Sequence, residues 1–201
     1  MFREYFELCR TNRNKYDCIL IRMSLIVLLS DFNILATTMR GNERHMCYEL
    51  SFLLKEAGDI EPKVEKSGIR GVIVAKTTLN PVEAIEKFRS ILQERPYEFR
   101  FSLRILPMEK VVHTSLEEIK RASSNLFAKL AEKETFRVTV EKRFTSLHSR
   151  DIIEAAVPEI KNKVELETPN KVLLIEVLGG YTGLSLIKPN DCISVMKEKM
   201  L

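Results

Sequence analysis

The stretch FRVTVEKR, residues 136–143, opens the last third of the chain, and its apolar residues alternate with polar ones. A period of two predicts a β-strand with one buried face. The stretch ends in a basic pair, Lys142 and Arg143. Ser149 then precedes an apolar-periodic run and predicts the start of a helix.

The rest of this third has the pattern of a small sheet. A short segment over 164–166 and a proline turn over 168–170 lead to a long apolar strand, 172–177, and a last strand, 184–187. Between these two strands lies the glycine-rich sequence 179–183, which predicts a strand-to-strand turn. A patterned sheet, a covering helix and a basic pair at a strand end favour a nucleic-acid-binding module over an active site.

This order of features resembles the THUMP domain, an RNA-binding module of several tRNA- and rRNA-modifying proteins. The family pattern has an aromatic-basic-valine strand, a Lys-Arg pair, a serine that opens a helix, an acidic-leucine pair, a proline turn and a strand ending in Glu-Val. The matching positions are Phe136, Arg137, Val138, Lys142, Arg143, Ser149, Glu165, Leu166, Pro169, Ile175, Glu176 and Val177. Glu165 stands where the family usually has Asp, and Lys171 stands where an acidic residue is common.

Composition is compatible with a polyanionic partner without requiring one. The 201 residues carry a net charge of +4, with 45% hydrophobic and 30% charged residues, as in ordinary soluble domains. The histidines and cysteines show no metal-ligand spacing, so we predict no metal and read Cys9, Cys18, Cys47 and Cys192 as reduced thiols of a cytoplasmic protein. The apolar run 19–29 is too short for a membrane span, and we expect no membrane partner.

The N-terminal part predicts a second domain. Strands are expected over 33–38, 60–66, 71–76 and 99–105, and helices are expected to begin at Asn42 and at Asn80. The order strand, helix, strand, strand, helix, strand suggests a ferredoxin-like βαββαβ domain. We therefore predict an α+β protein with residues 23–110 as a ferredoxin-like domain and residues 111–201 as the THUMP domain. Residues 1–22 are read as an extension or an upstream mis-start, since Met23 precedes the regular pattern.

A capping box links the two predicted domains. Thr114 or Ser115, with glutamates three residues on, predicts a helix that packs on the C-terminal sheet. Residues 107–113 are expected to be a connector. Arg100 and Arg104 fall on one face of the preceding strand and are expected to be solvated.

Six basic residues are candidates for RNA contact. They are Arg137, Lys142, Arg143, Lys171, Lys188 and Arg40. Alone, a Lys-Arg pair is usually an ordinary solvated pair, but together with the other basic residues of the domain it favours phosphate binding. Phe144 and Tyr181 are open to two interpretations, as rings that stack on unpaired bases or as packing residues. Replacing Lys142 and Arg143 by alanine is expected to weaken RNA binding with little effect on thermal stability.

No catalytic residue and no cofactor is predicted. The chain lacks GxSxG, GxGxxG, P-loop and HExxH motifs. Residues 40–42 read Arg-Gly-Asn after the first strand, which invites comparison with acylphosphatases, although the glycine-rich approach of that family is missing. The same turn after FNILATT, and the stretch PMEKVVHTSLEEI, resemble the tRNA-acetylation adaptors, a THUMP subfamily.

The resemblance implies a noncatalytic adaptor that holds tRNA by its acceptor stem and 3′ CCA end. A separate cytidine N4-acetyltransferase would supply the chemistry of N4-acetylcytidine formation. Two alternatives remain: an RNA-binding subunit of another tRNA-modifying system, such as methylation or thiolation, and a small enzyme of acylphosphatase type.

Overall fold

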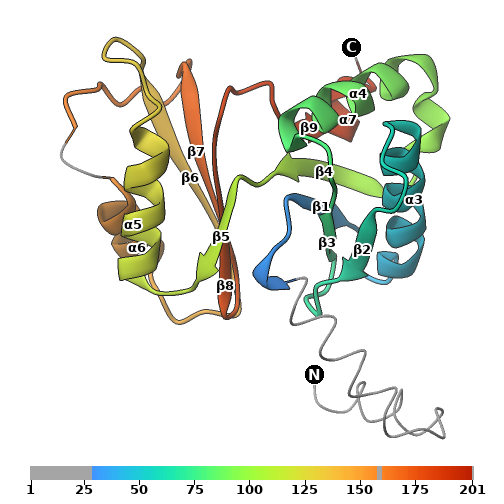
Figure 1. Ribbon diagram of the computed structural model, residues 1–201, viewed down its shortest axis with the longest axis horizontal. Coiled ribbons are helices and arrows are strands. Elements are labelled where there is room, and N and C mark those ends of the chain that lie inside the picture. Colours follow the sequence, from blue (N-terminus) through green and yellow to red (C-terminus); the bar gives the residue numbers. More distant parts are fainter. Residues whose placement is uncertain (1–28, 158–159, 201) are drawn as a thin grey trace, which may run out of the picture.

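The molecule has four layers, with two β-sheets face to face and helices on both outer sides (Figure 1). The computed structural model describes residues 29–157 and 160–200. Helices α3 and α4 lie on one side, and α5 and α6 lie on the other. The predicted extension 1–22, the boundary at residue 23, Cys9 and Cys18 lie outside the described residues.

The first sheet belongs to the N-terminal unit, whose elements follow the predicted order. They are β1 (Ile34–Thr38), α3 (Glu43–Glu56), β2 (Lys63–Lys66), β3 (Val72–Lys76), α4 (Pro81–Glu94) and β4 (Ser102–Pro107), with a short 3₁₀ turn (Pro96–Glu98) before β4. The strand order is β2-β3-β1-β4-β9, with antiparallel pairing between each pair of neighbours.

The second sheet is built from the C-terminal half. Its elements are β5 (Lys110–His113), α5 (Leu116–Phe127), β6 (Phe136–Arg143), α6 (Ser149–Ala156), β7 (Lys171–Leu178) and β8 (Tyr181–Ile187). The strand order is β5-β8-β7-β6, and only the pairing of β6 with β7 is parallel among the strands of the described residues. We call residues 110–187 the C-terminal unit.

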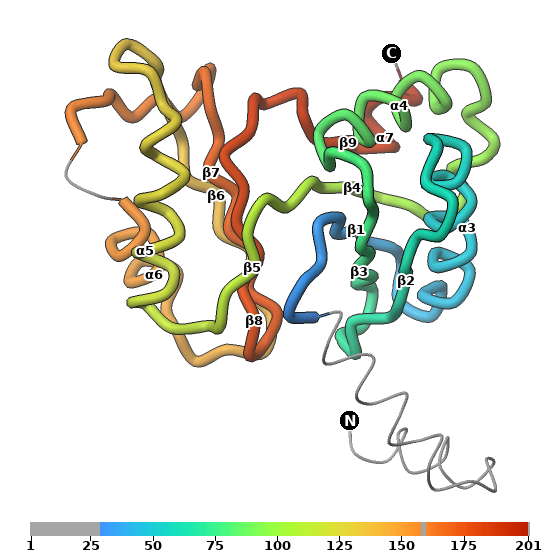
Figure 2. Tube along the Cα trace, in the orientation of Figure 1, coloured from blue at the N-terminus to red at the C-terminus, as the bar shows by residue number. Residues whose placement is uncertain are grey.

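After β8 the chain returns to the N-terminal unit, as the red end of the tube shows (Figure 2). Strand β9 (Ile193–Ser194) pairs with β4, and α7 (Val195–Glu198) follows it. The Arg89 side chain of α4 holds this return by donating to the carbonyls of Asn190 and Cys192 and by pairing with Glu198 at 3.1 Å. Two residues of pairing give little sequence signal, and the sequence analysis did not predict this return.

Side-chain caps set two of the helix starts as predicted. Asn80 Oδ1 accepts hydrogen bonds from the amides of Val82 and Glu83, and Pro81 is the first residue of α4. Ser115 Oγ accepts from the amide of Glu118 at the start of α5. Asn42 occupies the N-cap position of α3, so the predicted helix start is confirmed, but its side chain makes no capping hydrogen bond.

A third apolar core, besides the one under each helix pair, lies between the two sheets. Its buried residues come from both units: Phe32, Leu35, Val72, Val74, Leu106, Met108, Val172, Leu174, Leu178 and Ile187. The contact is close at Gly183, where an added Cβ would lie 3.0 Å from both Met108 Sδ and the Phe32 ring. Burial of these apolar side chains between the two sheets stabilises the packing of the two units against each other.

This core also corrects the prediction for Arg104. The side chain is half-buried and close to Glu176 of β7, whose pKa is raised by burial, an effect that is partly offset by nearby charges that include Arg104. The strand face is therefore covered by the second sheet at Arg104, whereas Arg100, which precedes β4, is exposed as predicted. The alternation of polar and apolar residues shows that the two faces of this strand differ. It does not show which part of the protein covers the more polar face.

Other boundaries differ from the predictions. Residues 107–113 are not a plain connector, because β5 lies within them and pairs with β8. Strand β4 begins at Ser102, β8 begins at Tyr181, and β6 includes Lys142 and Arg143. Among residues 29–157 and 160–200, no helix is both long and apolar enough to cross a bilayer.

Candidate nucleic-acid interface

Five of the six predicted basic residues are split between the two ends of the second sheet, and Arg40 lies in the other unit. Strand β6 runs parallel to β7, with Phe136 opposite Lys171 and Arg143 opposite Leu178. Arg137 and Lys171 therefore lie at one end, and Lys142 and Arg143 lie roughly 20 Å away at the other, since a strand advances about 3.3 Å per residue. They do not form one patch.

Lys142 and Arg143 lie at the end of the sheet that also carries the β7–β8 turn, and we call this the hairpin end. Gly179, in that turn, has φ +65° and donates its amide to the Arg143 carbonyl at 2.9 Å. Lys142 Nζ donates to the carbonyl of Leu147 at 2.7 Å, which leaves two ammonium protons for another partner.

Phe144 follows the basic pair and is 60% exposed. Its φ of +56° is the only positive value among the non-glycine residues that the structure describes. Left-handed backbone costs a bulky residue about 1 kcal/mol or more, so this strained turn is held by its surroundings and presents an aromatic ring to solvent.

Two helices begin at the hairpin end. Strand β5 ends beside Tyr181, because His113 pairs with that residue, and α5 starts directly afterwards. Strand β6 leads through residues 144–148 into α6. The N-terminal amides and positive dipole ends of both helices therefore lie at the same end of the sheet as Lys142 (Figure 1). Helix amides and dipoles favour an anion, and the acidic residues of the first turns, Glu117, Glu118 and Asp151, oppose it.

The α6 start is predictable from the sequence, but the position of the α5 start at this end of the sheet is not. The capping box at Ser115 predicts that α5 begins there, whereas residues 107–113 were predicted to be a connector. If strand β5 is not recognised, the sequence does not indicate at which end of the sheet α5 begins. The available signal was the pair of β-branched residues Val111 and Val112, which is short for a strand.

Aromatic and hydroxyl contacts fix the edge of the hairpin end. The rings of His113 and Tyr181 lie 4.9 Å apart, and the hydroxyls of Thr114 and Thr182 share a hydrogen bond of 2.8 Å. The amide of Thr114 donates to the Gly180 carbonyl. Tyr181 is half-buried in these contacts, so packing describes it better than stacking on a base.

Arg143 is tied to a buried carboxylate rather than displayed to solvent. Its Nη1 lies 2.8 Å from Glu176 Oε2, and the Glu176 side chain is only 3% exposed. Burial raises the pKa of Glu176 above its ordinary value, and the charges of Arg143 and Arg104 offset this only in part. Arg143 compensates a buried charge, and Lys142 is the basic side chain of the pair that faces water.

At the opposite end the predicted residues are also partly engaged. Arg137 Nη1 donates to the carbonyl of Leu166 at 2.8 Å. Lys171 begins β7, and Val172 pairs with Ile187, so Lys188 lies beside it on the neighbouring strand. The amide of Lys188 donates to Asp191, and its side chain is exposed.

Arg40 lies in the other unit, in the turn between β1 and α3. The amide of Gly41 in this turn and that of Gly71 in the turn before β3 donate to the two carboxylate oxygens of Glu43, at 3.0 and 2.7 Å. Partial burial raises the pKa of Glu43, but these backbone hydrogen bonds outweigh it and hold the pKa below its ordinary value. The Glu43 carboxylate thus occupies backbone amides that would otherwise be free to bind a phosphate. This disfavours an acylphosphatase-like site at the turn.

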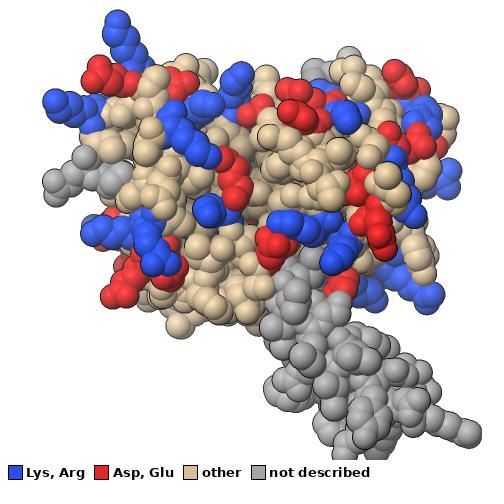
Figure 3. All heavy atoms as spheres, viewed as in Figure 1, with Lys and Arg blue, Asp and Glu red and all other residues tan. Residues whose placement is uncertain are grey.

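Charge is mixed over the face seen in Figure 3, where lysines and arginines alternate with acidic residues across both units. Within the described ranges, no three His, Cys, Asp or Glu side chains are grouped to hold a metal ion. Cys47 and Cys192 are free and half-buried, and burial raises the pKa of the Cys47 thiol to about 11.

A family model identifies the C-terminal unit. The model of the THUMP domain matches residues 113–187, from the end of β5 to the end of β8. The chain contains a THUMP domain. Its bounds take in both helix starts, the β7–β8 turn and the Lys142–Phe144 segment of the hairpin end. A THUMP domain indicates RNA binding in tRNA modification.

Relatives extend the similarity beyond the THUMP domain. The chain is 26% identical over 171 residues to human THUMP domain-containing protein 1, covering 74% of this chain and 45% of that protein. It is 32% identical over 96 residues to a Drosophila melanogaster homolog, covering 44% of this chain and 30% of that one. An uncharacterized Methanocaldococcus jannaschii protein is 31% identical over 128 residues, covering 62% of this chain and 34% of the relative. The chain therefore spans less than half the length of these relatives.

Two solved structures share the fold. PH1313 from Pyrococcus horikoshii superposes with a TM-score of 0.55 and 19% identity, covering 79% of this chain and 55% of that one. TrmN from Thermus thermophilus gives 0.52 and 20%, covering 78% and 45%. Because about four-fifths of this chain is covered in each case, the shared fold includes the N-terminal unit.

Proposed function

We propose that the chain is a noncatalytic tRNA-binding adaptor that binds RNA at the hairpin end of its THUMP domain. One observation carries this proposal: the N-termini of α5 and α6, Lys142 and the exposed ring of Phe144 lie at one end of one sheet. Helix amides and an ammonium group suit phosphates, and an exposed ring suits an unpaired base. These groups are suited to recognising the end of an RNA rather than its base sequence.

The proposed target is the acceptor stem and 3′ CCA end of tRNA. An acceptor stem offers closely spaced phosphates, and its unpaired 3′ nucleotides have free base faces. Arg137, Lys171 and Lys188, at the opposite end of the domain, remain candidate contacts to more distant phosphates. Arg40 remains one on the N-terminal unit.

The proposed partner is a separate cytidine N4-acetyltransferase, with the chain acting in the cytoplasm. The element order and antiparallel strand order of the N-terminal unit support a ferredoxin-like arrangement, and we assign this unit the role of a spacer between the bound end and the modified nucleotide. An RNA-binding subunit of another tRNA-modifying system would use the same RNA surface. Pull-down with tagged chain distinguishes the two by the enzyme recovered.

The RNA surface is tested by replacing one exposed lysine. Lys142→Ala removes a charge at the hairpin end, and we expect tRNA binding to weaken several-fold with a salt slope smaller by about 0.7–0.9. Lys133→Ala removes an equally exposed charge from the far end of the same unit and is the matched control. Fluorescence anisotropy with labelled tRNA at several salt concentrations measures both. Equal losses from the two variants would mean a generic basic surface and would refute the assignment.

A further inference from the structure

A pocket of about 270 Å³ lies on the N-terminal unit, between α3 and the segment that leads into β4. Four rings line it, from His45, Tyr48, Phe52 and Phe101. The charged residues of its lining are Glu49, Glu98 and Arg100. No aliphatic side chain takes part, which sets this pocket apart from the three apolar cores.

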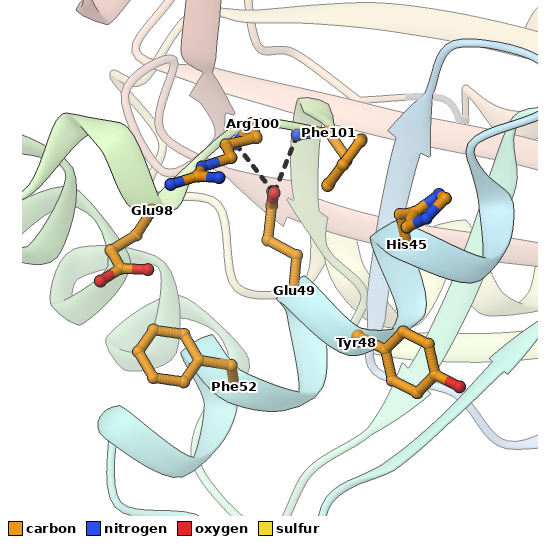
Figure 4. Close-up of a pocket in the computed structure, with 7 residues that line it drawn as sticks. All are labelled: His45, Tyr48, Glu49, Phe52, Glu98, Arg100 and Phe101. Atoms are coloured by element: carbon orange, nitrogen blue, oxygen red, sulfur yellow. Dashed lines mark hydrogen bonds between the residues drawn. The ribbon is translucent and has the colours of Figure 1, made fainter.

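Glu49 holds the wall of the pocket in place. Its carboxylate accepts hydrogen bonds from three successive amides, those of Arg100, Phe101 and Ser102, at 2.8, 2.8 and 2.9 Å. The same residue lies on α3, so the carboxylate ties the segment before β4 to the helix (Figure 4). All of its hydrogen bonds are to the chain itself, and it is therefore a positioning group rather than a contact for a ligand.

The aromatic surfaces are open to solvent. Tyr48 is 61% exposed and Phe52 is 38% exposed. The rings of His45 and Phe101 are stacked, with centroids 4.9 Å apart and an interplanar angle of 19°. The Arg44 guanidinium lies 5.8 Å from the centre of the Tyr48 ring, so this face already attracts a planar cation.

A free donor and a free acceptor lie together on the other side. Figure 4 shows Arg100 and Glu98 opposite His45 and Phe101, with Glu49 between them. Arg100 Nε donates to the Tyr97 carbonyl, and neither its Nη groups nor the Glu98 carboxylate has a hydrogen-bond partner in the part of the chain that the structure describes. Although they are neighbours in the lining, the two side chains form no ion pair with each other.

We infer that this pocket binds an unpaired nucleobase that carries an exocyclic amino group. A base supplies a flat face for the rings, an amino group that donates to Glu98, and a ring nitrogen that accepts from Arg100, to which the neighbouring phosphate can also bind. The inference rests on the proposed RNA binding and adds a second, single-stranded contact on the other unit. The competing occupant of the pocket is a side chain of a protein partner. Binding of such a partner would give a different experimental result.

The test uses the full chain and fluorescein-labelled hexamers of cytidylate, adenylate and uridylate. We expect the cytidylate and adenylate hexamers to bind more tightly than the uridylate hexamer, because uracil has no exocyclic amino group. Tyr48→Leu or Arg100→Ala should weaken cytidylate binding about tenfold, within the range for loss of one stacked base. Glu98→Gln should abolish the preference over uridylate, because an amide can also donate to a uracil carbonyl.

Two neighbours outside the lining provide matched controls. Tyr97, which is 59% exposed, controls for loss of an exposed ring as Tyr97→Leu. Lys55, which is exposed on α3 and lies outside the lining, controls for loss of a nearby charge as Lys55→Ala. Both should bind the hexamers as the parent chain does.

Three outcomes of the hexamer titrations would overturn the pocket assignment: no discrimination among the hexamers, no binding of any hexamer while tRNA still binds, or equal losses in lining and control variants. Loss of a co-purified protein in the lining variants, with hexamer binding retained, would assign the pocket to a protein partner and would likewise overturn it. Each of these leaves the hairpin-end proposal standing, since that depends on Lys142 and on intact tRNA.

Discussion

Neighbouring basic residues in the THUMP domain have different physical roles. Lys142 and Arg143 look equivalent in the sequence, but one faces water and the other neutralises Glu176 between the two sheets. A buried carboxylate that loses its partner is costly, because desolvation penalises the remaining charge. Simultaneous replacement of both residues therefore cannot test RNA binding alone, contrary to the expectation from the sequence.

Arg143→Ala should lower the free energy of unfolding by on the order of 3 kcal/mol, whereas Lys142→Ala should change it by less than about 0.5 kcal/mol. The reason is the uncompensated Glu176 carboxylate in the first variant. Urea denaturation of each variant, followed by circular dichroism, measures the difference.

A rescue experiment checks the cause. Arg143→Ala combined with Glu176→Gln removes both charges, and we expect it to recover most of the lost stability. If the double variant is no more stable than Arg143→Ala, the ion pair is not the source of the loss.

At the scale of elements, two asparagines show that the same residue at the start of a helix can have different structural roles. Asn80 and Asn42 both precede helices, but only Asn80 bonds to the helix amides with its side chain. At α3 the Glu43 carboxylate instead accepts from Gly41 and Gly71, and it thereby ties the helix start to the turn before β3.

Asn80→Ala should cost about 1 kcal/mol of stability, the usual effect of losing a side-chain cap. Asn42→Ala should cost a few tenths of a kcal/mol at most, because no capping bond is lost. Thermal denaturation of the two variants provides the comparison. Equal losses would contradict the difference in capping.

The sequence predicts elements well where local chemistry decides them. The alternation at 136–143, the cap at Asn80 and the capping box at Ser115 each gave the right element near its observed position. Strands β5 and β9 were missed, because each is short and is defined by pairing with a strand distant in sequence. The pocket beside α3 was missed for the same reason, since Tyr48 and Arg100 are brought together only by the fold.

For the molecule as a whole, the two sheets make one body with two separate candidate RNA contacts. The inter-sheet core and the return of the chain through β9 join the units. The hairpin end belongs to one unit, and the aromatic pocket belongs to the other. Such an arrangement suits a protein that holds an RNA at two points, and it makes the geometry between the units part of the function.

The most direct test of the central claim is a binding titration that compares intact tRNA with the same tRNA lacking its 3′ CCA, at several salt concentrations. We predict tight, salt-dependent binding of intact tRNA, because phosphate contacts release counterions, and a clear loss of affinity when the CCA end is removed. Equal affinity for both RNAs would contradict recognition of the acceptor end. Absence of binding even at low salt would contradict the proposed tRNA-binding function itself.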